Sequence, residues 1–303
     1  MSKTQYGGQA VLEGVMMRGK EDIAVAVRRS PENIVLKKMK VKSIGSKYPF
    51  LKLPFIRGIV ALFSSLIVGT KALSYSANQL AEEDEEEITT KEMVFSIMLA
   101  FAFAILLFVV FPATIVALVQ PYVDSNLILN FIEGIIKITA FLSYLFIISR
   151  MEDIKRVFMY HGAEHKVIFT HEEGLPLTVE NAKKFATLHP RCGTNFMFIV
   201  ILISIFFFTF FGRPPFLIRI MYHIILLPVI AGTSYEILKE AGGSRVCPTT
   251  GRVKINPIIK AIATPGLYLQ KLTTREPDDS MLEVAIEALK AVLPEQGKDE
   301  LSV

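Results

Sequence analysis

Two histidines and a glutamate lie within five residues of one another near the middle of the chain, in the sequence HGAEH at 161–165. Residues four apart project from the same face of an α-helix, so His161 and His165 can bind one metal ion together. The spacing H-x-x-E-H is the inverted zincin pattern, in which the carboxylate acts as general base toward water at the metal. The pattern predicts a divalent metal site, zinc before other ions, with Glu164 as the catalytic residue. The alternative interpretation is a solvated or hydrogen-bonded helix face.

The same central segment contains further candidate ligands. A catalytic zinc site typically has three protein ligands of the His, Cys or carboxylate type. His189 and Cys192 are the stronger candidates, because Pro190 and Gly193 constrain the chain around them at the start of an apolar segment. The alternative is that these two residues only pack at the membrane interface. Additional candidates for the site are His171, Arg191, Asn195 and Glu236.

The composition is that of an integral membrane protein. The mean hydropathy is +0.44 and 51% of the residues are hydrophobic, concentrated in blocks. A helix needs about 20 apolar residues to cross the hydrocarbon core of a bilayer. Segment 93–119 carries no charge and is the clearest crossing. Further crossings are predicted at 130–149, 195–211 and 216–238, the last two forming a hairpin around the helix-breaking tetrapeptide 212–215.

Segment 55–72 has a short uncharged stretch between Arg57 and Lys71, which favours a re-entrant or interfacial helix over a crossing. The segment 150–191 is rich in Lys and Arg, whereas loop 120–129 has neither. The positive-inside rule therefore places the central segment and both termini in the cytoplasm, as in a four-span protein. Five spans, with 55–72 crossing, is the alternative. On this topology Cys192 and Cys247 are cytoplasmic and we expect no disulfide.

The N-terminal region predicts β structure. Apolar and polar residues alternate on both sides of the turn signal at 30–33, which is typical of a β-hairpin. The glycine-rich segment 7–19 suits tight turns or close backbone approach, and its spacing matches no nucleotide-binding loop. The basic residues of this region can contact anionic lipid, at about 1 kcal/mol per residue near the surface, or form a solvated strand face: Arg28, Arg29, Lys37, Lys38, Lys40, Lys42 and Lys47.

Together these patterns predict a mainly α membrane protein, a four-span helical bundle plus one re-entrant or interfacial helix, with a small N-terminal β-hairpin region and cytoplasmic α/loop segments. In the last of these we expect a short helix at 255–262, a break at 264–266 and a capped amphipathic helix from Asp278. The expected regions are a cytoplasmic β-rich region 1–50, the interfacial helix 51–78, an acidic linker 79–92, a transmembrane hairpin 93–149, a cytoplasmic His-rich loop 150–194, a second hairpin 195–238 and a cytoplasmic C-terminal region 239–303.

Four motifs in order make the chain resemble the YqhQ-like family of bacterial integral membrane proteins, a domain family of unknown function. They are GGQAVLEGVMMRG at 7–19, YHGAEHK at 160–166, HPRCGTNF at 189–196 and TTREPDDSMLEVAIEAL at 273–289. The resemblance covers nearly all of residues 5–293. Its members are described as predicted metal-dependent enzymes, so the resemblance implies a bacterial inner-membrane protein with the same metal chemistry, and no particular substrate.

Two functions fit the sequence. The first is a metal-dependent hydrolase that acts on a peptide, lipid or phosphoester at the cytoplasmic membrane face. The second is a non-enzymatic transporter or assembly factor, which ionisable residues inside the membrane would favour. Glu133 and Lys137 are spaced to pair with each other, and we expect His223 to hydrogen-bond a neighbouring helix. The lipid bilayer is an expected partner, nucleic acid is not, and the sequence leaves turnover and protein partners open.

Overall fold

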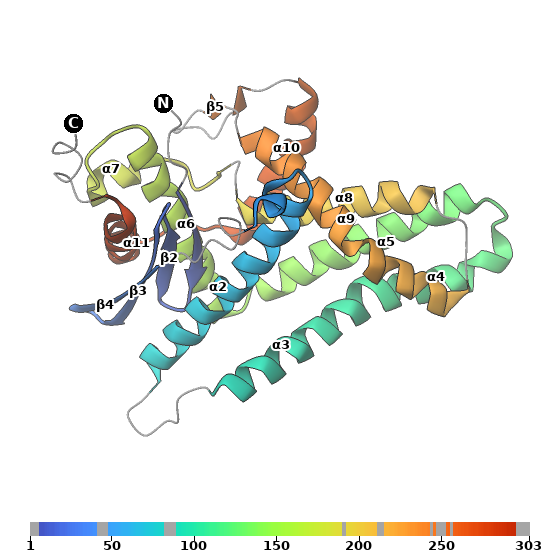
Figure 1. Ribbon diagram of the computed structural model, residues 1–303, viewed down its shortest axis with the longest axis horizontal. Coiled ribbons are helices and arrows are strands. Elements are labelled where there is room, and N and C mark those ends of the chain that lie inside the picture. The colour runs from blue at the N-terminus through green and yellow to red at the C-terminus, as the bar shows by residue number, and fades with distance from the viewer. Residues whose placement is uncertain are drawn as a thin grey trace.

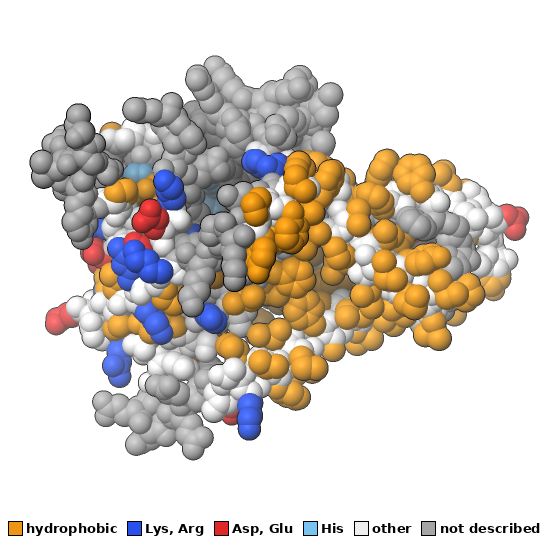
Figure 2. All heavy atoms as spheres, in the orientation of Figure 1, with side chains coloured by type: hydrophobic (Ala, Val, Ile, Leu, Met, Phe, Trp, Pro, Cys, Tyr) orange, Lys and Arg blue, Asp and Glu red, His pale blue; other side chains and the backbone are white. Residues whose placement is uncertain are grey.

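The computed structural model describes residues 6–40, 48–81, 89–189, 192–210, 215–242, 245–246, 253–254 and 257–294. A small sheet with its covering helices lies at one end, and a bundle of long helices extends from it (Figure 1). Figure 2 shows hydrophobic side chains gathered over the bundle, with charged side chains mostly at the end that holds the sheet. The protein therefore has two parts: a sheet domain, made of residues 6–40, 152–183 and 279–292, and an apolar helical part.

The sheet is an antiparallel meander in the order β1-β2-β3-β4. Its strands are β1 (Gly7–Val11), β2 (Gly14–Arg18), β3 (Asp22–Ser30) and β4 (Asn33–Lys40). The predicted hairpin is confirmed, because Ser30 pairs with Asn33 at the turn between β3 and β4. The glycine-rich segment forms the additional strands β1 and β2, which the sequence analysis did not predict as strands.

Both faces of the sheet are covered. Successive side chains of a strand point to opposite faces, so Ala24 and Ala26 join a core with α6 (Glu152–Glu172), α7 (Val179–Lys183) and α11 (Asp279–Val292). Val25 and Val27 face the other way and pack with Ala72 of α2 (Ile56–Leu80). The central strand β3 is therefore apolar on both faces, and the sheet is held between α6 and α11 on one side and α2 on the other.

Within the described residues, four helices are long and apolar enough to cross a membrane, by length and composition: residues 56–80, 90–122, 126–148 and 220–239. The second is a continuous run of α3 (Thr90–Ile105), η2 (Leu106–Val110), α4 (Phe111–Val119) and η3 (Gln120–Tyr122). The third is α5 (Asn126–Ile148) and the fourth lies in α9 (Phe216–Gly242). Helix α8 (Gly193–Thr209) is apolar but shorter, with 17 residues.

Helix α2 differs from the sequence prediction in length. It is one continuous helix of 25 residues and qualifies as a span by composition, whereas α8, predicted to cross, falls short. The packing of α2 nevertheless fixes both ends of this helix against other parts of the protein. Arg57 forms an ion pair with Glu236 of α9, and the Ser76 hydroxyl accepts a hydrogen bond of 3.3 Å from the Leu12 amide of the sheet domain. Because its C-terminal half covers the sheet, an interfacial position of α2 stays our proposal.

Buried charges join three helices inside the bundle. Glu133 and Lys137 of α5 form the predicted i,i+4 pair at 2.8 Å. The Lys137 Nζ lies 2.8 Å from Nε2 of His223 in α9, which confirms the expected contact of His223 with a neighbouring helix. The His223 ring stacks on Phe208 of α8, with centroids 3.9 Å apart. The cluster connects α5, α8 and α9.

The segment 150–194, expected as a connection between spans with His161 and His165 on a helix, contains the 21-residue helix α6 followed by α7. One local prediction is wrong. The expected break at 264–266 is absent, because α10 (Pro257–Thr273) continues through Pro265. Proline removes one helical hydrogen bond, but Gly266 lies against Asn195 of α8, and this packing keeps the helix intact. Asp278 does cap α11, by accepting a 2.9 Å hydrogen bond from the Met281 amide.

Three short elements flank the long helices. A short 3-10 helix, η1 (Pro49–Lys52), precedes α2, and β5 (Arg245–Val246) pairs with β6 (Val253–Lys254) before α10. The acidic run 82–87, the loop 212–214, Arg191, Cys247, Lys42 and Lys47 lie outside the described residues.

Candidate metal centre

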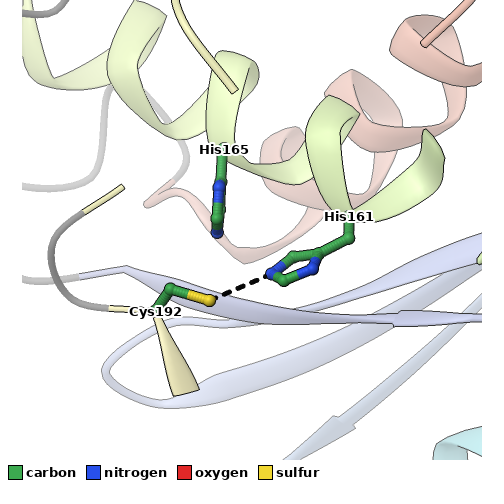
Figure 3. Close-up of side chains that lie close together, drawn as sticks. All are labelled: His161, His165 and Cys192. Atoms are coloured by element: carbon green, nitrogen blue, oxygen red, sulfur yellow. Dashed lines mark hydrogen bonds between the residues drawn. The ribbon is translucent and has the colours of Figure 1, made fainter. Parts of the chain in front are cut away.

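His161, His165 and Cys192 lie together where the sheet domain meets the apolar helices. The two histidines are one turn apart on α6, with ring centroids separated by 4.4 Å. Cys192 immediately precedes α8 and its side chain caps that helix. Figure 3 shows the three side chains pointing toward one another from these two elements. Their candidate ligand atoms all lie within 4.8 Å of one another, the one such group of three or more in the described part of the chain.

Both imidazoles are oriented by backbone carbonyl groups. Nδ1 of His161 donates a hydrogen bond of 2.8 Å to the carbonyl oxygen of Thr273, and Nδ1 of His165 donates to that of Thr187. A donor role for Nδ1 leaves Nε2 unprotonated in the neutral ring, which is the state that binds a metal. Nε2 of His161 lies 3.1 Å from Sγ of Cys192. The site therefore presents two nitrogen ligands and one sulfur ligand.

Gly162 explains how the Thr273 carbonyl reaches His161. A Cβ at Gly162 would overlap the carbonyl oxygen of Arg275, so only glycine lets the chain after α10 cross α6 at this point. The crossing is fixed by a 2.9 Å hydrogen bond from the Arg275 amide to the carbonyl of Phe158. Gly162 thus allows the chain after α10 to approach α6 closely enough for the Thr273 carbonyl to bond His161.

Electrostatics favour the thiolate form of Cys192. Burial raises the pKa of the Cys192 thiol, but the adjacent His161 and His165 outweigh it and bring the pKa well below its usual value. Burial lowers the pKa of His161, while Cys192 and Glu164 raise it to about 9. A thiolate is the form of cysteine that binds metals. Cys192 and His161 therefore favour a thiolate–imidazolium pair, and a divalent cation that binds here would displace the proton on Nε2 of His161.

The spacing of the three ligands fits a tetrahedral ion after a small contraction. Zinc, with Zn–N of about 2.0 Å and Zn–S of about 2.3 Å, separates its ligand atoms by about 3.3 to 3.6 Å. The His161–Cys192 separation of 3.1 Å is already near this range, and no pair of ligand atoms is more than 4.8 Å apart. A two-histidine, one-cysteine set also leaves a fourth position for water or substrate, as catalytic zinc sites do.

Glu164 is buried next to this group and contacts strand β1. Burial raises the pKa of its carboxyl group, while His165 and His161 act in the opposite direction. The Gly8 amide donates a hydrogen bond to the carboxylate, and a Cβ at Gly8 would lie only 2.8 Å from Cδ of Glu164. Glu164 is thus placed either to accept a proton near the cluster or to connect α6 to β1.

A hollow of about 480 Å³ gives access to the cluster. Its walls come from β1, α2, α6 and the start of α8, and they include the three ligand candidates, Glu164 and His189. The hollow thus opens at the junction of the sheet domain with two apolar helices.

His189 lies beside the cluster without belonging to the group of three. Its ring centroid is 5.4 Å from that of His165 and 4.5 Å from that of Phe169. Its amide donates to the side chain of Gln270, which donates back to its carbonyl, both at 2.7 Å. The Gln270 side chain therefore fixes the backbone of His189, and His189 lines the hollow.

The other candidates serve different contacts. Asn195 accepts a 3.0 Å hydrogen bond from Gln270 and packs against Gly266, so it helps join α8 to α10. His171 packs edge-on against Tyr6. Glu236 does not line the hollow, because its carboxylate is bound by Arg57 of α2. The roles of Gly8, Thr187, Thr273 and Gln270 were not predicted from the sequence; three of these residues act through backbone groups, which carry no signal in residue type.

The chain matches a family model described as "Protein of unknown function (DUF1385)" over residues 53–295. The chain belongs to this family. It is also similar to the "Uncharacterized protein YqhQ" of Bacillus subtilis (strain 168), with 36% identity over 301 residues that cover 95% of this chain and 92% of that protein. No solved structure matches the chain. The resemblance to the YqhQ-like family is thereby confirmed.

Proposed function

We propose that this protein is a membrane-embedded metal-dependent hydrolase that acts at the cytoplasmic face of the bacterial inner membrane. The observation that carries the proposal is the convergence of His161, His165 and Cys192, with both Nδ1 atoms held by carbonyl groups, in the wall of a hollow that also contains Glu164. Zinc is the ion that this mixed nitrogen and sulfur set favours.

Each residue has a defined part in this proposal. His161, His165 and Cys192 would hold a divalent ion, which would supply a Lewis acid toward the oxygen of a scissile carbonyl or phosphoryl group. Glu164 accepts a proton from water in the hollow, a role suited to a carboxyl group whose pKa is raised by burial. The carbonyls of Thr273 and Thr187 fix the two rings, which keeps Nε2 of each directed at the same point.

The substitution Glu164→Gln separates a catalytic from a structural role of Glu164. It keeps the side-chain shape but cannot accept a proton, and removal of a general base typically costs 10²- to 10⁴-fold in rate. We expect the variant to insert, to retain metal and to keep wild-type thermal stability while failing to complement a deletion strain. Metal content, melting temperature and complementation are measured for the same variants.

The exposed Glu173, which caps the C-terminal end of α6, provides the matched control. Glu173→Gln should complement fully. Full complementation by a stable Glu164→Gln protein would remove the general base from the proposal. A Glu164→Gln protein that loses abundance and stability together would instead assign Glu164 to the contact between α6 and β1.

The topology that accompanies this proposal has both termini and α6 in the cytoplasm, since basic residues gather in 150–191. Contact of the basic N-terminal region with anionic lipid belongs to the same proposal. Lys37, Lys38 and Lys40 all lie on β4, although Lys38 and Lys40 both pair with Asp22, which reduces the charge available for lipid.

A transporter or assembly factor is the second candidate, and the cluster of Glu133, Lys137 and His223 favours it. Ionisable groups buried among apolar helices often mark ion or substrate pathways. Here the charges compensate one another across two helices, which also suits a fixed contact that holds the bundle together. Complementation by Glu164→Gln would move the assignment to this second function.

A further inference from the structure

A second hollow lies beside the candidate metal centre. It measures about 240 Å³ and shares Gly7, Gly8, Gln9 and Ser65 with the larger hollow. A Cβ at Gly7 would meet no atom within 4 Å, so the shared wall is open at this point. The two hollows are therefore neighbouring parts of one recess, and a ligand in one can extend into the other.

Arg18 is the basic residue of the smaller hollow. It ends β2, pairs with Gly7 in the sheet register and is half-buried. Other arginines of the same domain have partners: Arg28 binds Glu283 and Arg156 binds Glu13. Among the residues that the structure describes, the guanidinium of Arg18 has neither a hydrogen-bond nor an ion-pair partner. A partly desolvated guanidinium without a partner favours an anion, and its planar fork matches phosphate oxygens.

The rim of the recess is apolar. Ser65 lies on α2 next to Leu66, whose side chain is 41% exposed, and the larger hollow ends at Met197 of α8, which is 47% exposed. Both helices are apolar along their length. A ligand that enters between them passes exposed hydrocarbon side chains before it reaches Arg18. Such a path suits an amphiphile that carries a charged head and an apolar tail.

We propose that the hollow around Arg18 binds the phosphate of a membrane lipid head group, with the adjoining part of the lipid in the larger hollow next to His161, His165 and Cys192. This names the substrate class of the proposed hydrolase and rests on that function for any cleavage. Binding of the phosphate by Arg18 does not depend on the metal. Arg18 is thus a specificity-determining residue in the binding recess.

The test measures binding of dioctanoyl phosphatidic acid to the purified full-length protein in a non-ionic detergent. Arg18→Gln should weaken this binding tenfold or more, since a charge-assisted bidentate contact is lost. The matched control is Arg29→Gln, which removes the same charge from an exposed position on β3 and should bind as the wild type does. Dioctanoylglycerol, which has the tails without the phosphate, should bind weakly and equally to all three proteins.

Ser65→Trp tests whether the recess itself is the site. The indole should fill the space that both hollows share and weaken binding of the phosphatidic acid, whereas Ile67→Trp, at a position of the same helix that lines neither hollow, should not. Arg18→Lys keeps the charge without the fork and serves if the glutamine variant does not fold; it should bind with intermediate affinity.

Wild-type affinity for the phosphatidic acid in a folded Arg18→Gln or Arg18→Lys protein would overturn the proposal. Inorganic phosphate that competes as strongly as the lipid would also overturn it, in favour of a soluble anion. Metal content is measured on the same samples. Binding that depends on Arg18 in a protein that holds no metal would leave the lipid site standing while the hydrolase proposal fails.

Discussion

At the scale of single residues, two backbone carbonyls decide what the histidines can do. The carbonyl oxygens of Thr273 and Thr187 accept hydrogen bonds from Nδ1 of His161 and His165, so each ring turns Nε2 toward Cys192. A histidine pair on a helix is a common feature with many uses. A pair whose rings are both fixed in the metal-binding tautomer next to a thiolate is a much more specific arrangement.

Asp278 provides a prediction of pH dependence at this scale. Burial raises the pKa of its carboxyl group, but the Ser280 hydroxyl and the amides of Met281 and Ser280 outweigh this and lower the pKa below 3.8. Because the pKa is lower in the folded state, the carboxylate stabilises the protein above pH 3.8 and loses this effect as the pH falls through the folded pKa. Asp278→Ala should cost about 1 kcal/mol of unfolding free energy near pH 7 and less below pH 4.

Denaturant unfolding of the detergent-solubilised protein, followed by circular dichroism, measures this difference at each pH. Asp278→Asn is the matched control, because it keeps an oxygen acceptor for the helix amides without a titrating group. Relative to the wild type, Asp278→Asn should lose less unfolding free energy near pH 7 than Asp278→Ala does. A constant deficit of Asp278→Ala from pH 7 to pH 3 would show that the capping carboxylate does not contribute as described.

The sequence predicts part of the site and not the rest. His161 and His165 follow from helical periodicity, which is local. The choice between His189 and Cys192 as third ligand depends on the chain between α7 and α8, where Gln270 from a distant helix holds the backbone of His189. That contact is tertiary, so spacing alone left both residues as candidates.

At the scale of elements, the contact between β1 and α6 positions Glu164. Gly8 lies so close to the glutamate that a Cβ there would be 2.8 Å from both Cδ of Glu164 and the carbonyl oxygen of Met16. At Gly7, one residue earlier, a Cβ would meet nothing within 4 Å. Two adjacent glycines of one strand therefore have different structural requirements.

This difference predicts opposite outcomes for two alanine substitutions. Gly8→Ala should destabilise the protein by about 1 to 3 kcal/mol through overpacking and should weaken metal binding by displacing α6. Gly7→Ala should stay within about 0.5 kcal/mol of the wild type. Thermal unfolding and metal content of both variants test the contact. Equal stability of the two would mean that β1 and α6 are not packed as described.

Elements were predictable where their signal is local. The hairpin of β3 and β4 and the capped helix α11 follow from alternation, turn residues and an N-cap, all within a short window. Strands β1 and β2 were missed because glycine is depleted in strands, and here glycine is required by close neighbours such as Glu164. Helix α10 runs through Pro265 because packing on α8 compensates for the lost hydrogen bond.

At the scale of the whole molecule, the candidate metal centre lies where the sheet domain, α2 and α8 meet. None of these parts contains the site alone, since the hollow has walls from each. The arrangement predicts that the orientation of the chain in the membrane decides which compartment supplies the metal and the water. If α6 lies in the cytoplasm, as we propose, both come from the cytoplasm.

Cysteine labelling in intact cells tests this orientation, with Cys192 retained because it is buried. In a Cys247→Ser background, a membrane-impermeant maleimide should label Asp124→Cys from outside and should label Lys155→Cys only after lysis, because Lys155 lies on α6 and is exposed. Lys3→Cys should also be protected in intact cells. Labelling of position 3 from outside would establish five spans, with α2 as a true crossing.

The metal content of the purified full-length protein tests the central claim most directly. Mass spectrometry of the elements should find about one divalent ion per chain in the wild type and in His171→Ala, a control that removes a histidine of α6 outside the group of three. The double variant His161→Ala, His165→Ala should bind the ion tenfold or more weakly. Equal metal content in the wild type and the double variant would contradict the assignment of His161, His165 and Cys192 as a metal centre.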